Sequence, residues 1–106
     1  MNKYSIEITE KAELDIKSAF NYIAEELGNY SAAQALLSET EKAIKSLSYM
    51  PSRNALIDDP IIADFGFRSL KVKNYLVFYI LNENEKCVRI VRFLYARSDW
   101  QSLLKD

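Results

Sequence analysis

The sequence contains no histidine, and this absence restricts its chemistry more than any other feature of its composition. Histidine is the usual general acid or base near neutral pH, so such a role would fall to a lysine, tyrosine, aspartate or glutamate with a shifted pKa. A Ser-His-Asp or Cys-His nucleophile system is excluded. A single cysteine, Cys87, also excludes an internal disulfide and leaves no zinc-type ligand set. We therefore expect neither a metal nor a cofactor.

Glycine and proline are also scarce, with two of each in 106 residues. Many fibrous and disordered chains are rich in one or both, so the low counts argue against these classes. With 49% hydrophobic residues the chain can bury one core, and we expect a single domain over residues 1–106. In the opening MNKYSIEITEKAE, charges interrupt every short apolar run, unlike in a signal peptide or a membrane span. We therefore expect a cytoplasmic protein that does not enter membranes.

Charge is unevenly distributed, although the net charge is only −1. Residues 1–65 contain six basic and eleven acidic side chains, whereas residues 66–106 contain eight and four. One interpretation is a solvated, acidic helical surface in the first part. The other is a basic surface in the second part that binds an anionic partner. A pI of about 5.5 favours the first interpretation, because it is unusual for a dedicated nucleic-acid binder.

The first half of the chain predicts a strand followed by two helices. Residues 3–8 alternate apolar and polar side chains, which indicates a half-buried strand. Thr9 can cap a helix whose apolar residues recur at helical spacing until Gly28 ends it. Ser31 and Gln34 form a capping box for a second helix. The short link between the two helices requires an antiparallel hairpin.

The second half predicts three strands and a short terminal helix. Residues 51–65 have no clear period and are expected to form a long loop, with one helical turn around Ile61-Ile62. Ser98 is expected to cap the terminal helix, and Trp100 to pack it back on the core. The expected strands span residues 67–72, 75–81 and 87–95. The order β-α-α-β-β-β indicates an α+β fold, in which the helical hairpin covers one face of a mainly antiparallel four-stranded sheet.

Four successive segments together have the pattern of one protein family. They are the opening strand with AFNYIAEELGNYSAAQALLSETEKAIKSL, which ends at MP, the strand pair RSLKVKNYLVFYIL, the polar hairpin NENEK, and VRIVRFLYARSDWQSLL. In this order the segments resemble the RelE/ParE superfamily of toxins from bacterial type II toxin–antitoxin modules. The resemblance covers nearly the whole chain.

This resemblance implies a growth-inhibiting toxin of the kind found in plasmid stabilisation modules. A cognate antitoxin, usually encoded beside the toxin, holds such a protein silent by wrapping its helices and sheet edge, so a hetero-oligomer is expected. Within the one fold, ParE-like members poison DNA gyrase and need no catalytic residues. RelE-like members enter the ribosome and cut messenger RNA.

Cleavage of RNA needs a base, a proton source and positive charge at the phosphate. The resemblance assigns Lys71 and Arg97 to the basic positions of RelE-like members. Tyr95, or Tyr79 in its place, is a candidate proton carrier, although an ordinary tyrosine pKa of about 10 makes that role costly. The chain departs from that pattern twice, with Leu76 where those members carry arginine and Leu103 where they carry tyrosine. These departures favour the ParE-like branch. A metal-independent mRNA-cleaving enzyme is the alternative.

Six side chains are candidates for binding the target or the antitoxin, namely Arg68, Lys71, Lys73, Arg92, Tyr95 and Arg97. Each also has a structural interpretation. Strand arginines can pair with helix acids or with the acidic hairpin, which is the expected partner of Arg89, and lysines beside a turn are commonly solvated. Arg68 and Lys71 have opposite strand parity, so we expect them on opposite faces of the sheet. Arg97 is the strongest candidate, because an arginine that closes an apolar strand needs solvent, a carboxylate or a partner.

Overall fold

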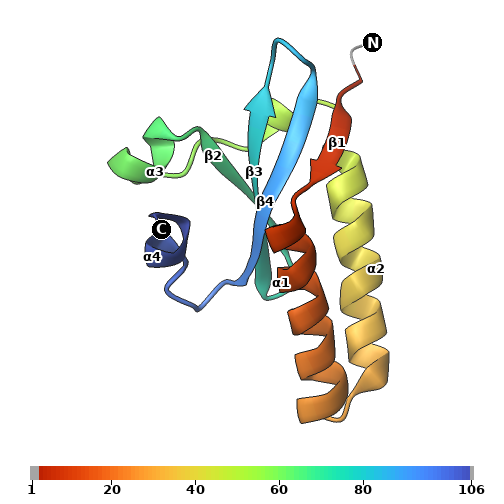
Figure 1. Cartoon of the computed structure of the whole chain (residues 1–106). Helices are drawn as coiled ribbons and strands as arrows, with labels where there is room; N and C mark the ends of the chain where they lie inside the picture. Colours follow the sequence, from red (N-terminus) through yellow and green to blue (C-terminus); the bar gives the residue numbers. More distant parts are fainter. Residues whose placement is uncertain (1–2, 106) are drawn as a thin grey trace.

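The computed structural model describes residues 3–105 and has the predicted order of elements (Figure 1). The elements are β1 (Ser5–Ile8), α1 (Glu10–Asn21), the π-helical turn η1 (Tyr22–Glu26), α2 (Tyr30–Ser46), the 3-10 turn η2 (Pro51–Arg53), α3 (Pro60–Asp64), β2 (Phe67–Val72), β3 (Tyr75–Asn82), β4 (Cys87–Tyr95) and α4 (Trp100–Lys105). The α+β class, the helical hairpin and the short C-terminal helix are therefore confirmed. None of the helices in residues 3–105 is long and apolar enough to cross a membrane.

The four strands form one sheet in the order β1-β4-β3-β2. The pairs β2–β3 and β3–β4 are antiparallel, whereas β1 runs parallel to β4. The last strand of the chain thus lies inside the sheet, between the first strand and β3 (Figure 1). A β-bulge interrupts the β3–β4 register, because Phe78 faces Arg92 while Tyr79 faces Ile90.

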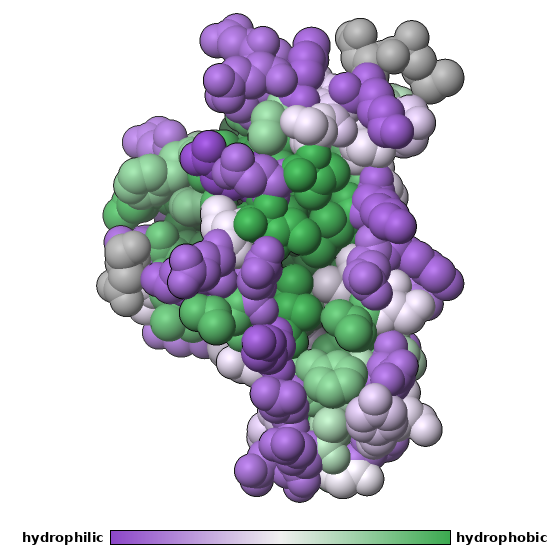
Figure 2. Space-filling model, turned by 45° about the vertical axis from the view of Figure 1, so that its right-hand side comes forward, coloured by the Kyte–Doolittle hydropathy of each residue, from purple (hydrophilic) through white to green (hydrophobic). Residues whose placement is uncertain are grey.

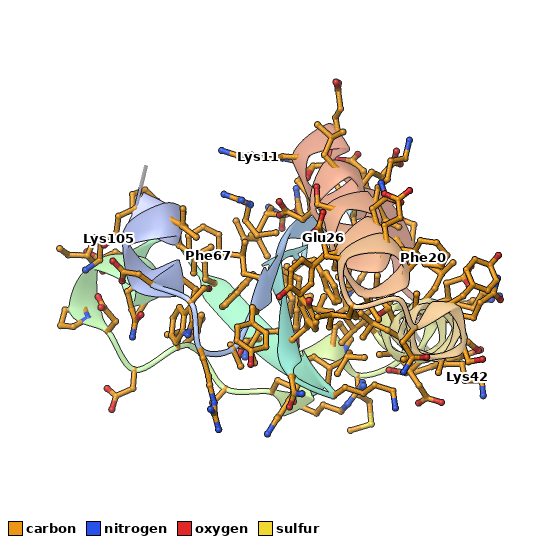
Figure 3. The ribbon with its side chains drawn as sticks, turned by 90° about the horizontal axis from the view of Figure 1, so that it is seen from below. Lys11, Phe20, Glu26, Lys42, Phe67 and Lys105 are labelled. Atoms are coloured by element: carbon orange, nitrogen blue, oxygen red, sulfur yellow. The ribbon has the colours of Figure 1, made fainter. Side chains whose placement is uncertain are left out.

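Helices cover the two faces of the sheet unequally. The hairpin of α1 and α2 packs on one face, named here the hairpin face, and forms the larger apolar cluster with Val77, Tyr79 and Phe93. The opposite face, named here the α4 face, carries a smaller cluster in which Ile62 and Leu104 pack against Phe78 and Leu94. Figure 3 shows the hairpin, with Phe20 and Lys42, on one side of the strands, and α4, with Lys105, on the other.

The predicted ends of the helical hairpin are partly confirmed. The Thr9 side chain accepts the N–H of Ala12 at 3.2 Å and caps α1. Gly28 has a φ of +64°, a left-handed conformation that reverses the chain after η1. The capping box at Ser31 is wrong: α2 begins at Tyr30, and its N-cap is Asn29, two residues earlier, whose side chain accepts the N–H of Ala32 at 3.0 Å. Asn29 directly follows the reversal, so it is the first residue that can serve as the cap.

The predicted cap of the terminal helix is also wrong. α4 begins at Trp100, two residues after Ser98, and the Ser98 hydroxyl donates to the carbonyl oxygen of Tyr95 at 2.6 Å. That hydroxyl therefore closes the turn after β4 instead of starting the helix. The packing of Trp100 is confirmed, since its ring centroid lies 5.3 Å from that of Phe78.

Candidate functional site

The predicted binding residues divide into those engaged inside the fold and those that are exposed. Arg68 belongs to the first group. It is half-buried on the hairpin side of β2, and its Nη1 donates to the carbonyl oxygens of Asn54 at 2.6 Å and of Ser52 at 3.4 Å. The Tyr79 hydroxyl, fully buried, donates to Pro51 O at 2.6 Å in the same loop. Arg68 thus stabilises, through these hydrogen bonds, the segment that links the hairpin to β2.

Arg92 is also engaged within the fold. Its guanidinium donates to both carboxylate oxygens of Asp15 on α1, at 2.7 and 3.1 Å, and the side chains are 15% and 16% exposed. This agrees with the structural interpretation of Arg92 as the partner of a helix acid. The partner expected for Arg89 is wrong: Arg89 pairs with Glu7, at 2.7 Å, and not with the acidic hairpin. The parallel register of β1 and β4 sets Glu7 opposite Arg89.

The exposed group consists of Tyr95 and three charged residues, Lys71, Lys73 and Arg97. No carboxylate within residues 3–105 lies within 4.0 Å of any of these three charged side chains. Lys73 occupies the β2–β3 turn with a φ of +53°. Arg97 follows β4, where the N–H of Ala96 donates to Asn74 O at 2.8 Å. This hydrogen bond joins the turn that carries Lys73 to the turn that carries Arg97.

The sheet register separates two of the three candidate nuclease residues. Lys71 faces Leu76 in the β2–β3 pair, and Leu76 faces Leu94 in the next pair, on the α4 face. Tyr95 faces Tyr75 on the hairpin face, with ring centroids 5.5 Å apart. Side chains on opposite faces cannot converge on one phosphate. The fold therefore does not bring Lys71 and Tyr95 together.

The two leucines that depart from the nuclease pattern both lie on or near the α4 face. Leu76 packs against the smaller apolar cluster, and Leu103 is 36% exposed on α4. Neither side chain can exchange a proton. Within residues 3–105, no group of His, Cys, Asp and Glu side chains is arranged to hold a metal ion.

A cleft at the tip of the hairpin brings together residues that the sequence analysis did not combine. Its lining consists of Tyr22, Ile23, Leu27, Asn74, Tyr75 and Tyr95, from η1, the β2–β3 turn and the strands β3 and β4. Burial raises the pKa of the Tyr75 phenol, and the neighbouring phenols of Tyr95 and Tyr22 raise it further. No local pattern could have predicted this cleft, because its walls come from distant parts of the chain.

An apolar groove runs between α1 and α2 on their outer side. Its floor consists of Ile6, Ile8, Ile16, Phe20 and Leu37, and charged residues such as Glu13 and Lys45 line its edges. Figure 2 shows hydrophobic surface between hydrophilic bands on this side of the molecule. The hairpin thus buries one side against the sheet and leaves apolar side chains open on the other.

The comparison with protein-family models decides the identity of the fold. Residues 6–100 match the model described as the ParE toxin of the type II toxin–antitoxin system, parDE. The chain belongs to this ParE toxin family. The resemblance to RelE/ParE toxins is therefore confirmed. No curated protein sequence matches the chain.

Solved structures share the ParE fold at low sequence identity. The chromosomal ParDE system of P. aeruginosa has a TM-score of 0.72 and 17% identity, over 92% of this chain and 100% of that one. The toxin–antitoxin complex RelBE2 of Mycobacterium tuberculosis has a TM-score of 0.61 and 19% identity, over 88% and 98%. The isolated RelE toxin of E. coli has a TM-score of 0.53 and 16% identity, over 94% and 93%. At these identities the likeness establishes a common fold.

Proposed function

We propose that this ParE-family chain inhibits growth by binding a protein target such as DNA gyrase, and that a cognate antitoxin neutralises it. Membership of the ParE family supports the toxin role. The toxin would act in the cytoplasm as a single domain. Together with its antitoxin it would stabilise a plasmid that carries both genes.

The observation that carries the choice of binding over cleavage is the separation of Lys71 and Tyr95 by the sheet. Cleavage by the 2′-hydroxyl requires a proton acceptor and a proton donor around one phosphate. Tyr75 packs against Tyr95, and its pKa is raised above its ordinary value of about 10, so even less of its phenol is deprotonated near neutral pH. A toxin that only binds its target needs none of these groups.

The open groove between α1 and α2 supports an antitoxin partner. An amphipathic helix with apolar residues at helical spacing fits a groove lined by Ile8, Ile16 and Leu37. Two of the similar structures are described as toxin–antitoxin complexes, which adds support. The resting form would then be a hetero-oligomer of toxin and antitoxin.

The RNA-cleaving alternative has one observation in its favour. Lys71, Lys73 and Arg97 are exposed, and no carboxylate within residues 3–105 pairs with them, so they are free to contact phosphates. A nuclease of this type would have to use a proton carrier other than Tyr95 beside Lys71.

Induced expression of the chain alone tests the proposal. Incorporation of labelled thymidine should fall before incorporation of labelled methionine, and the purified chain should inhibit supercoiling by gyrase. Co-expression of the cognate antitoxin should restore growth. Protein synthesis that failed first, together with cut transcripts, would contradict the gyrase target and support the nuclease.

A further inference from the structure

The cleft at the tip of the hairpin, named here the tyrosine cleft, has a volume in the range of binding pockets. Its volume is about 510 Å³, and a second cavity of about 330 Å³ adjoins it. The two cavities share Ile23, Leu27, Asn74 and Tyr75, and the second also reaches Lys73. They form one continuous depression where the tip of the hairpin meets the β2–β3 turn.

The large side chains of the tyrosine cleft are exposed although they are close together. Tyr22 is 53% exposed, Leu27 59% and Tyr95 43%. Within residues 3–105, the hydroxyls of Tyr22, Tyr75 and Tyr95 make no hydrogen bond to another residue, whereas the Tyr79 hydroxyl makes two. The exposed rings therefore contribute little to the core, and their hydroxyls are available to a partner.

The tyrosine cleft is also held in a fixed shape. Tyr75 stacks on Phe93 with ring centroids 4.9 Å apart and an interplanar angle of 3°, and the Tyr95 ring stands at 68° against Tyr75. The hydrogen bond from Ala96 N to Asn74 O fixes the two turns that form the rim. A pocket that is already formed loses little entropy on binding, and rigid tyrosines are enriched among the residues that dominate protein–protein affinity.

The positive charge at the rim of the cleft indicates that the bound segment carries a negative charge. Lys73 is the one charged side chain that lines either cavity among residues 3–105, and Arg97 lies two positions after Tyr95. An occupant with a carboxylate beside its apolar anchor would complement Lys73. Nucleic acid fits less well, because a run of phosphates needs several positive charges, whereas Lys73 alone lines the cavities within residues 3–105.

We infer that the tyrosine cleft is the contact site for the protein target. A segment of the target inserts a large apolar side chain between Tyr22 and Tyr95, and sets a carboxylate of the same segment beside Lys73. This inference rests on the proposed function, a toxin that acts by binding a protein. It assigns target binding to the tip of the hairpin beside the β2–β3 turn, and this site is separate from the groove between α1 and α2.

The test compares the double variant Tyr22→Ala/Tyr95→Ala with the control Tyr30→Ala in the full chain. Tyr30 is 61% exposed on α2 and lines neither cavity. Colony survival after induction should be at least about 100-fold higher with the double variant than with the parent chain. The concentration of the chain needed to inhibit gyrase should rise by the same factor. The double variant should still capture the antitoxin, which also establishes that it is folded. Tyr30→Ala should behave as the parent chain does.

A charge series provides a second test that leaves the rings intact. Lys73→Gln should weaken gyrase inhibition by roughly 3-fold to 10-fold, and Lys73→Glu by more, because the reversed charge repels the carboxylate of the target. Equal inhibition by the parent chain and both Lys73 variants would contradict the carboxylate assigned to the occupant.

Three results would overturn the inference. One is a folded double variant that remains as toxic as the parent chain. Another is a double variant that keeps its toxicity but loses the antitoxin, since the cleft would then belong to the antitoxin. The third is binding of fluorescein-labelled oligothymidylate by the parent chain and its loss in the double variant, which would make the cleft a nucleic-acid site. If the parent chain killed cells without inhibiting gyrase, gyrase would not be the target. Survival of cells that express the double variant would in that case still support the cleft as the contact site for another protein target.

Discussion

Arg92 and Asp15 form a two-point ion pair that ties the last strand of the sheet to the first helix. The Nε–Oδ2 distance is 2.7 Å and the Nη2–Oδ1 distance is 3.1 Å. The same carboxylate accepts the backbone N–H of Phe93 at 3.1 Å. Within residues 3–105, β1 pairs with β4 only as far as Ile90, so Asp15 satisfies a strand N–H for which β1 offers no acceptor, although β3 continues on the other side of β4.

Replacement of Asp15 by alanine should therefore destabilise the fold strongly. The change leaves a half-buried guanidinium without its carboxylate and the Phe93 N–H without its acceptor, at a cost of about 3 kcal/mol in the free energy of unfolding. Urea denaturation followed by circular dichroism measures this difference. Glu7→Ala is the matched control, because the Glu7–Arg89 pair is more than half exposed and its loss should cost less than about 1 kcal/mol. Equal losses in the two variants would contradict the role assigned to Asp15.

Replacement of Tyr79 by phenylalanine should loosen the loop between the hairpin and β2. The fully buried hydroxyl donates to Pro51 O at 2.6 Å and accepts from Asn54 Nδ2 at 3.0 Å. Its removal leaves both groups without this partner and should cost about 1–2 kcal/mol. The same variant should be cut faster by protease within this loop. Tyr30→Phe, which removes a hydroxyl from an exposed ring, should leave both measurements unchanged.

Two positions with left-handed backbone conformation should respond in opposite directions. Gly28 has a φ of +64°, and Gly28→Ala should lower the free energy of unfolding by about 1 kcal/mol, since an L side chain is strained there. Met50 has a φ of +48° and is 74% exposed, so Met50→Gly should relieve strain and raise stability by up to about 1 kcal/mol. Thermal unfolding of both variants checks the signs. A stabilising Gly28→Ala would show that the turn can adopt another conformation.

The fold should lose stability in acid partly because the Asp59 carboxylate becomes protonated. The backbone N–H of Ile62, which the carboxylate accepts at 3.3 Å, lowers the pKa of Asp59, and the Lys105 ammonium at 3.4 Å lowers it further. A depressed folded-state pKa means that this stabilisation is present above the unfolded-state pKa of about 3.9 and is lost as pH falls through the folded-state value. The Tm difference between the parent chain and Asp59→Asn should therefore stay constant from neutral pH down to about 4 and shrink as the pH is lowered further. Asp58→Asn, which alters an exposed neighbour, should give no such trend.

Arg97 and Lys71 should differ in their effect on toxicity. Arg97 lies beyond Tyr95 at the sheet end that carries the tyrosine cleft, whereas Lys71 lies on the α4 face beside Leu76. Arg97→Ala should weaken target inhibition by roughly 10-fold, which corresponds to about 1.4 kcal/mol, and Lys71→Ala should have little effect. Growth after induction and supercoiling by gyrase provide the measurements. Loss of toxicity in Lys71→Ala alone would reverse this order and favour cleavage of RNA.

The main elements could be predicted because each has a local signal. The Thr9 cap, the Gly28 stop and the alternation in β2 depend on residues close together in sequence. The parity argument that separates Arg68 from Lys71 also needed only the period of a strand, and the register confirms it. The wrong caps at Ser31 and Ser98 arose where two polar residues compete within a few positions, and the turn geometry selects between them.

The site was harder to predict because it depends on strand order. The pairing of Arg89 with Glu7 follows from the parallel contact between β1 and β4, which no local pattern reveals. Likewise, Arg92 reaches Asp15 next to a bulge at Phe78, and the bulge cannot be located from alternation alone. The tyrosine cleft combines η1 with the ends of β3 and β4, so it exists only in the folded chain.

The central position of β4 has a consequence for how the toxin is made. Among residues 3–105, β1 pairs with no strand other than β4, and β4 is the last of the four strands to be synthesised. Until β4 has left the ribosomal exit tunnel, the nascent chain can form the helical hairpin but cannot complete the sheet or the Asp15–Arg92 pair. We therefore expect the chain to become harmful only once β4 has emerged. An antitoxin that recognises the hairpin alone could thus bind the chain before it becomes active.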